Sequence, residues 1–158
     1  MSYMHELKTV ITYGTFDLFH VGHLRLLQRL KDLGGKLIVG VSTDEFNAEK
    51  GKKCIIPYEQ RVEILRNLRQ VDLVIPECNW EQKLEDIKKY KVDIFAMGSD
   101  WAGKFDFLNE ACAVVYLDRT DGISTTELKN VLSEIEPKKI NDFKKALEVM
   151  LVMAEEFK

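Results

Sequence analysis

At 158 residues, the chain is long enough for one domain that buries its own core without disulfides or a structural metal. Hydrophobic residues make up 46% of the sequence and charged residues 31%, which is the balance of an ordinary soluble protein. The formal net charge of -3 argues against broad nucleic-acid binding, because such binding needs a clustered basic face. Any anion-binding site is therefore expected to involve a small group of residues rather than a broad basic surface.

Cysteine usage and the N-terminal segment indicate the compartment. Cys54, Cys78 and Cys112 are far apart and form no C-x-x-C pair, so they suggest neither a disulfide framework nor a zinc site. The first residues lack the apolar core of a signal peptide, and no apolar run is long enough to cross a bilayer. We therefore predict a cytoplasmic protein with reduced thiols and no membrane insertion.

Strand-like runs alternate with helical patterns through most of the chain. Strands are predicted at residues 10–13, 37–41, 73–75, 94–97 and 114–117, and helices at residues 21–33, 58–68, 80–89 and 125–135. This alternation is typical of a parallel sheet that is covered by helices on both faces. The predicted fold class is therefore α/β, with a Rossmann-like, open, parallel sheet of five strands.

The junction between the first strand and the first helix carries the most informative motif, which runs from Gly14 to His23 and reads GTFDLFHVGH. Gly14 is expected to let the backbone turn, and the leucine spacing that follows predicts a helix start near Val21. A helix start attracts anions, and residues three apart share a face, so His20 and His23 are expected to point at one phosphate. On the residues alone, a metal pair or two surface side chains remain alternatives.

A second motif follows the last predicted strand and reads RTDGISTT over residues 119–126. Ser124 or Thr125 can cap the next helix, and Ser124 with Glu127 fits a capping box. Taken alone, the motif predicts an ordinary helix start. Ligands of open parallel sheets bind at the carboxyl ends of the strands, so two helix starts facing one cleft would hold the two ends of a triphosphate.

The chain ends in a predicted amphipathic helix beyond Pro137. Its apolar face is formed by Ile140, Phe143, Leu147, Met150, Leu151 and Phe157. The polar face carries mixed charge rather than a basic stripe, so we expect this helix to pack on the domain or on a partner subunit rather than on a membrane. The predicted division is a domain over residues 1–131 and a helical extension over residues 132–158.

The first motif resembles the signature of the cytidylyltransferase group within the HIGH-motif nucleotidyltransferases. From about Lys8 to about Lys129, the chain is similar to the bacterial members that make CDP-glycerol for teichoic-acid and capsule-type polymers. Further matching segments lie at residues 42–47, 58–61, 71–72, 79–83, 97–101 and 103–108. The resemblance implies a nucleotidyltransferase-type fold, transfer of a cytidylyl group from CTP to glycerol 3-phosphate with release of pyrophosphate, and a homodimer.

The resemblance also implies roles for individual residues at matching positions. The nucleotide phosphates would be contacted by Thr15, Phe16, His20, His23 and Lys50. CTP would also be bound by Arg119, Thr120, Ile123, Ser124 and Thr125, with Ser124 and Thr125 near its phosphates, and Asp100 would help to position the base and ribose. Among these, His20, His23, Lys50 and Arg119 are the expected catalytic residues. Lys83 and Trp80 would lie on the acceptor side. A Mg²⁺ would be held largely by the phosphates of CTP, with Asp17 as the nearest candidate ligand.

Other interpretations of these residues stay open. The lysines at 50, 52 and 53 can be a solvated charge run, and Trp80 can pack on the core. We interpret Arg61 and Arg69 as structural partners of residues such as Asp72 rather than as ligands. A different small acceptor, such as phosphoethanolamine, phosphocholine or a sugar-alcohol phosphate, is the nearest alternative function. A nucleotide-binding regulator without turnover is the alternative from another class.

Overall fold

The computed structural model describes residues 7–120, 122, 124–134 and 137–156. Five parallel strands form one sheet in the order β3-β2-β1-β4-β5. The strands are β1 (Lys8–Gly14), β2 (Gly35–Ser42), β3 (Leu73–Glu77), β4 (Ile94–Gly98) and β5 (Ala113–Leu117). The predicted five-stranded parallel sheet is confirmed, and the chain order reverses between β1 and β4, which is where such sheets bind ligands.

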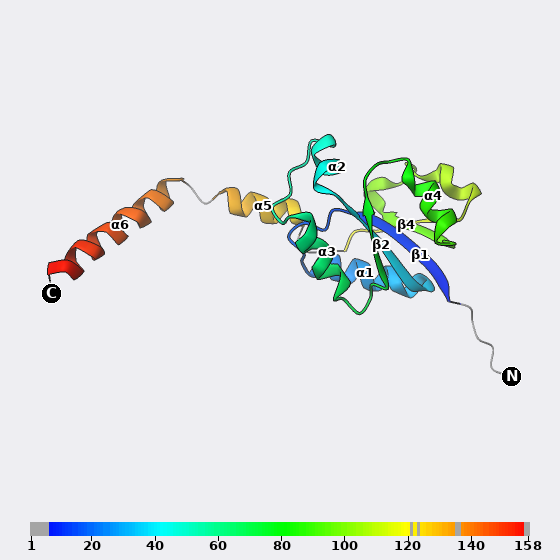
Figure 1. Ribbon diagram of the computed structural model, residues 1–158, viewed down its shortest axis with the longest axis horizontal. Coiled ribbons are helices and arrows are strands. Elements are labelled where there is room, and N and C mark those ends of the chain that lie inside the picture. The colour runs from blue at the N-terminus through cyan, green and yellow to red at the C-terminus, as the bar shows by residue number, and fades with distance from the viewer. Residues whose placement is uncertain (1–6, 121, 123, 135–136, 157–158) are drawn as a thin grey trace. The chain divides into compact units, whose positions relative to one another are not determined.

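Helices cover both faces of this sheet, as predicted (Figure 1). The elements of this first part of the chain are α1 (Val21–Gly34), α2 (Asp44–Glu49), α3 (Tyr58–Arg66), α4 (Gln82–Lys89) and the 3-10 helices η1 (Ser99–Trp101) and η2 (Asp106–Glu110). Leu27 of α1 and Leu65 of α3 lie in the core on one face, whereas Ile87 of α4 and Leu108 of η2 lie in the core on the other.

The burial of the central strand β1 shows why helices pack on both faces of the sheet. Val10 and Ile11 are adjacent in sequence and both fully buried, but they belong to different core clusters. Successive side chains of a strand point to opposite faces, so a strand that is apolar at consecutive positions must be buried on both sides. The continuous apolar runs of the sequence therefore account for the two-sided packing.

The predicted and observed elements differ after β2 and after β3. The helix expected from residue 80 begins at Gln82. Asn79 Oδ1 accepts from Gln82 N at 2.8 Å, and the Gln82 side chain accepts from the amides of Cys78 and Asn79, which is the reciprocal pattern of a capping box at the entry to the helix. The short helix α2 was not predicted; Thr43 caps it by accepting from Phe46 N at 3.1 Å.

The chain divides into two compact units between residues 123 and 124. The second unit contains α5 (Thr125–Ser133) and α6 (Pro137–Glu156). Ser124 and Glu127 form the predicted capping box, with Glu127 N donating to Ser124 Oγ at 3.1 Å and Ser124 N to Glu127 Oε2 at 2.9 Å. The predicted boundary at residue 131 and the predicted packing of α6 stay predictions. Over the described residues, no helix combines the length and apolarity that a membrane span requires.

Candidate active site

The loop from β1 to α1 makes its turn at two residues in left-handed backbone conformations, Phe16 (φ 54) and Leu18 (φ 48). The turn was expected at Gly14, which instead ends β1 and has no positive φ. Gly14 matters for its size, since a Cβ there would lie 2.9 Å from the ring of Phe16. Left-handed conformations are uncommon for residues other than glycine, and they concentrate at functional loops.

This backbone course turns the side chain of Asp17 inward, where it is 2% exposed. Its carboxylate accepts backbone hydrogen bonds from Leu18 at 3.1 Å, from Ile55 at 2.8 Å and from Ile56 at 2.9 Å. Asp17 therefore fastens the β1–α1 loop to the segment that follows α2. Thr15 makes a second link, because its hydroxyl donates to Asn47 Oδ1 of α2 at 3.1 Å.

His20 and His23 form the cap of α1, which begins at Val21 as predicted. His20 Nδ1 accepts from Gly22 N at 3.0 Å, and His23 Nδ1 accepts from His20 N at 3.2 Å. An imidazole nitrogen that accepts a hydrogen bond carries no proton, so each neutral ring carries its proton on Nε2. The two side chains can therefore each offer one N–H to an anion.

The environment of His23 keeps this ring neutral. Burial lowers the pKa of His23 to about 4, with a smaller lowering by His20 and an opposing effect of Asp17. The ring also lies against Phe16 and Phe19, with centroid separations of 5.5 Å and 5.3 Å. At neutral pH, His23 is therefore a neutral hydrogen-bond donor in the absence of an anion.

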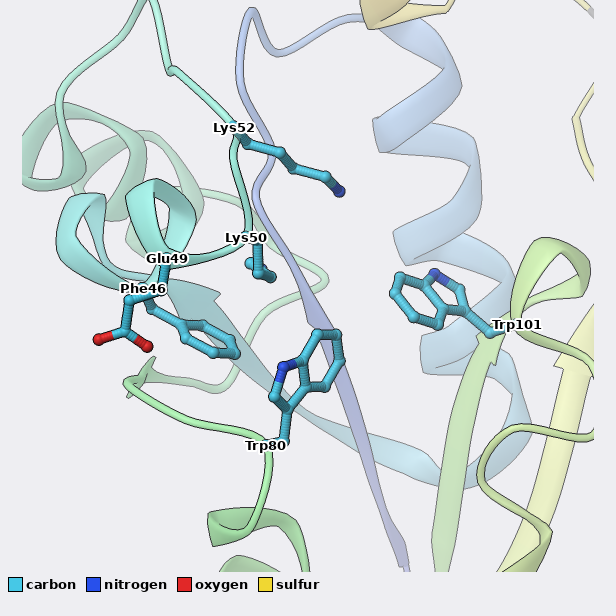
Figure 2. Close-up of a pocket in the computed structure, with 6 residues that line it drawn as sticks. All are labelled: Phe46, Glu49, Lys50, Lys52, Trp80 and Trp101. Carbon is cyan, nitrogen blue, oxygen red and sulfur yellow. The ribbon is translucent and has the colours of Figure 1, made fainter.

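A pocket of about 490 Å³ opens beside the ends of β2 and β3 (Figure 2). Its lining consists of Phe46, Glu49, Lys50, Lys52, Trp80 and Trp101. The rings of Trp80 and Trp101 are 5.8 Å apart. Figure 2 shows Lys52 extending toward Trp101 and the Glu49 carboxylate pointing away from both tryptophans. Aromatic walls with ammonium groups suit a small anion that also has an apolar or hydroxylated part.

Lys50 is anchored at this pocket rather than solvated. Its ammonium donates to Ser42 Oγ at 3.1 Å and lies 4.2 Å from the ring centroid of Phe46. Burial lowers the pKa of Lys50, and the negative charge of Glu77 opposes that shift. The charge-run interpretation is therefore wrong for this lysine.

Lys83 lies deeper than expected for a residue on the acceptor side. Its side chain is 1% exposed, and its ammonium pairs with Glu77 Oε1 at 2.8 Å. The same ammonium is 4.9 Å from the ring centroid of Trp80, which is half-exposed and lines the pocket. Trp80 therefore separates Lys83 from the pocket in this structure, and acceptor binding by Lys83 stays a prediction.

Two of the residues expected around CTP lie together. Arg119 donates to Asp100 with Nη2 at 2.7 Å and with Nε at 3.1 Å. This pair lowers the pKa of Asp100, and both side chains are exposed. Thr120 Oγ1 is buried and has no hydrogen-bond partner among the described residues. Ile123 lies outside the described residues, while Ser124 and Thr125 begin the second unit, so their roles stay predictions.

Arg61 has a structural role, as expected, but its partner is not Asp72. It is 1% exposed and pairs with Asp44 at 2.7 Å. It also donates to the carbonyl oxygens of Thr15, Ser42 and Ile56 at 2.7, 2.9 and 2.9 Å. Asp72 instead pairs with Lys31 and accepts from Leu37 N. The fan-shaped guanidinium thus ties together the ends of β1 and β2 and the start of α3.

Ser42 and Glu77 were not among the predicted site residues, although both contact site lysines. They end β2 and β3, where they are paired in register. The Ser42 hydroxyl donates to Glu77 Oε2 at 2.5 Å. Each of these two residues is a polar residue at the end of an apolar strand, and it lies at the edge where parallel sheets bind ligands. That pattern in the sequence would have identified both.

Comparison with known proteins gives a consistent result. The family model described as cytidylyltransferase-like matches residues 11–131. The glycerol-3-phosphate cytidylyltransferase of Bacillus spizizenii is 59% identical over 129 residues, which is 82% of this chain and 100% of that protein. The enzyme of the same name from Staphylococcus aureus is 56% identical over 126 residues, which is 80% of this chain and 96% of that protein.

A solved structure agrees with the fold. The lipopolysaccharide core biosynthesis protein from Thermoplasma volcanium is similar with a TM-score of 0.62 and 25% identity, over 73% of this chain and 99% of that one. The family match covers the strands that end at the site and the helix capped by His20 and His23. On this basis, the chain belongs to the cytidylyltransferase-like family.

Proposed function

We propose that this protein transfers the cytidylyl group of CTP to glycerol 3-phosphate, giving CDP-glycerol and pyrophosphate. The observation that carries the proposal is 56–59% identity to glycerol-3-phosphate cytidylyltransferases over 96–100% of their length. The site supports it with the imidazole pair at the start of α1 and the lysine-lined aromatic pocket nearby. Both lie at the carboxyl edge of the sheet.

The reaction needs no nucleophile from the protein. A phosphate oxygen of glycerol 3-phosphate attacks the α-phosphorus of CTP in line, a new P–O bond forms, and the bond to pyrophosphate breaks. The attacking oxygen is already ionised at neutral pH, so no strong base is needed. Catalysis then consists of aligning two anions and neutralising the charge that develops.

His20 and His23 donate their Nε2–H groups to phosphate oxygens of CTP. Their contribution grows as negative charge accumulates on the departing pyrophosphate, because a neutral donor gains most from the more highly charged acceptor. The hydrogen bonds at both Nδ1 atoms fix the two rings before CTP arrives. Little reorganisation is therefore needed during the reaction.

Cationic side chains offset the repulsion between the two substrates. Lys50 at the pocket and Arg119 beside Asp100 face the triphosphate, and Lys83 with Trp80 serves the acceptor side. Two multiply charged anions repel strongly in a site of low dielectric, so each ammonium or guanidinium contributes directly to their approach. Thr15, Phe16, Asp100, Thr120, Ile123, Ser124 and Thr125 complete the proposed CTP site.

Mg²⁺ is the proposed cofactor; it would be held largely by the phosphates of CTP and would neutralise part of their charge. The described residues contain no cluster of three or more histidine, cysteine, aspartate or glutamate side chains that would hold an ion alone. Asp17 is the proposed protein ligand. Its carboxylate is 2% exposed and accepts from three backbone amides, two of them at Oδ1, so only Oδ2 would have a lone pair left for the ion.

We further propose that the protein acts in the cytoplasm, as a homodimer, in teichoic-acid or capsule-type polymer synthesis. Light scattering at micromolar concentration tests the dimer. A monomeric mass at every concentration would contradict it.

Pyrophosphate release tests the activity itself. The assay combines CTP and Mg²⁺ with glycerol 3-phosphate, phosphoethanolamine, phosphocholine or ribitol 5-phosphate, and uses ATP as the control nucleotide. Release with CTP and glycerol 3-phosphate alone is expected. Turnover with another acceptor would keep the mechanism and replace the acceptor, whereas CTP binding without pyrophosphate release would favour a regulator.

A further inference from the structure

A buried chain of polar groups connects the two site lysines through one carboxylate. Lys83 Nζ donates to Glu77 Oε1 at 2.8 Å, and Ser42 Oγ donates to Glu77 Oε2 at 2.5 Å. Lys50 Nζ in turn donates to Ser42 Oγ at 3.1 Å. Each oxygen of the carboxylate therefore serves a different ammonium group, one directly and one through a hydroxyl.

Stability alone does not explain this arrangement. Glu77 is 3% exposed, and Lys83 and Ser42 are 1% exposed. Removing two charges from water costs several kcal/mol per ion, so a buried pair contributes no more to stability than well-packed apolar side chains of similar size. The pair is also enclosed by aromatic rings, with Tyr13 4.6 Å and Phe105 5.7 Å from the Lys83 ammonium.

The chain of contacts reaches the pocket through Trp80 and Lys50. The Trp80 ring lies 4.9 Å from the Lys83 ammonium and 5.5 Å from the Lys50 ammonium, and both Trp80 and Lys50 line the pocket. Two ammonium groups share one carboxylate, so this set of charges keeps one positive charge uncompensated. Such a charge beside an aromatic pocket attracts an anion.

The proton of Ser42 makes the connection directional. An ionised Glu77 accepts only, so the single hydroxyl proton of Ser42 must point at Glu77. The lone pairs of Ser42 are then left for Lys50, which is the geometry observed. Glu77 thus determines the orientation of a lysine that it does not contact directly.

We propose that Glu77 is a positioning residue for the transfer reaction, because it aligns Lys83 directly and Lys50 through Ser42. The inference rests on the proposed function, since it concerns the approach of glycerol 3-phosphate to CTP. Misplacing a charged group by about 1 Å costs up to about 100-fold in rate. The loss should be larger with both substrates present than in the binding of CTP alone, where only Lys50 contributes.

The test is steady-state kinetics of Glu77→Gln, with calorimetric binding of CTP in the absence of acceptor. We expect kcat/KM for glycerol 3-phosphate to fall by about 10- to 100-fold, while the Kd of CTP, which depends on Lys50 and not on Lys83, rises by less than about 10-fold. Glu81→Gln is the matched control, because it removes one exposed negative charge from the start of α4, and we expect it to behave as the wild type. Equal kcat/KM for Glu77→Gln and the wild type would overturn the inference.

Ser42→Ala provides a second route if Glu77→Gln does not fold, because it keeps the buried Glu77–Lys83 pair and disconnects only Lys50. We expect a fall of about 3- to 10-fold in kcat/KM, and the double variant should lose no more than Glu77→Gln alone. Full additivity, or an unaffected Ser42→Ala, would overturn the inference. A wild type without turnover of CTP and glycerol 3-phosphate would instead overturn the proposed function.

Discussion

The imidazole rings of His20 and His23 stack with their centroids 3.9 Å apart and their planes inclined by 24°. Both rings also cap α1 through their Nδ1 atoms. The same two side chains therefore define the start of a helix and present two N–H groups to an anion. Substitutions can separate these two contributions.

His20→Asn should keep the helix cap and lose the catalytic donor. Asparagine is among the best N-cap residues, so we expect the free energy of unfolding to stay within about 0.5 kcal/mol of the wild type. Loss of one donor to developing negative charge should lower kcat by about 100-fold or more, with a smaller effect on the KM for CTP. Stopped-assay kinetics and urea denaturation measure the two effects.

His20→Ala is the comparison variant. It should lose the same factor in kcat and, in addition, about 1 kcal/mol of stability. A His20→Asn enzyme with normal kcat would rule out the donor role.

Stability should fall as the pH drops from 6.5 toward 4, because His23 stays neutral in the folded protein. Burial holds the pKa of His23 at about 4, whereas the unfolded chain takes up a proton near 6.5. The unfolded state therefore binds more protons in this range, which lowers the free energy of unfolding by on the order of 3 kcal/mol. Denaturant titrations of the wild type and His23→Gln isolate this contribution, since glutamine can still reach the N-cap amide and does not titrate. Parallel pH profiles for the two proteins would show that His23 does not titrate in this way.

Arg61→Lys should destabilise the fold strongly. Lysine cannot reach Asp44 and the carbonyl oxygens of Thr15 and Ser42 at the same time. Leaving buried acceptors and a buried charge without their partners costs about 3 to 5 kcal/mol. Guanidinium denaturation should show this loss, whereas the exposed Arg69→Lys should change stability by less than about 0.5 kcal/mol. Similar midpoints for both variants would contradict the role of Arg61 as a tie between strand ends.

Asp100→Asn should affect nucleotide binding more than stability. The pair with Arg119 is exposed, so its loss should change the free energy of unfolding by less than about 1 kcal/mol. Loss of the Asp100 contact to Arg119 should raise the KM for CTP by about 5-fold, which corresponds to that energy. Asp118→Asn removes the neighbouring exposed charge and serves as the control. An unchanged KM for CTP in Asp100→Asn would show that the Asp100–Arg119 pair does not contribute to CTP binding.

Deleting residues 135–158 should leave the transfer activity in place. The family match ends at residue 131, and 129 residues of this chain match the whole length of the Bacillus spizizenii relative. Pyrophosphate release by the shortened chain should therefore remain within about 3-fold of the full chain, because the deletion removes none of the proposed site residues. Light scattering of both chains then shows whether α6 contributes to a dimer. Loss of turnover in a folded, shortened chain would contradict the prediction.

The sequence predicted the elements whose signals are local. The leucine spacing after His20 placed the start of α1, and Ser124 with Glu127 placed the start of α5, because a helix cap depends on residues a few positions apart. The apolar runs likewise predicted all five strands. These features need no knowledge of how distant segments pack.

Contacts between distant segments were not predicted, because they depend on how those segments pack. The Arg61–Asp44 pair and the bond from Ser42 to Glu77 depend on which strands lie side by side and in what register. Helix α2 has six residues, too few to show a helical period. The turn at Phe16 and Leu18 was missed because the sequence rule looks for glycine at such positions.

The pairing of Ser42 with Glu77 also bears on how the protein acquires activity during folding. Parallel strands β2 and β3 meet in one register, and a slip by one residue would turn Glu77 to the opposite face of the sheet. The two residues are separated by 35 positions in the chain, so their pairing is a non-local contact of the kind that forms more slowly than contacts within a helix. A refolding molecule in which α1 has formed but β3 has not yet paired with β2 would therefore show helical circular dichroism without turnover. The recovery of activity would then mark the pairing of β3 with β2.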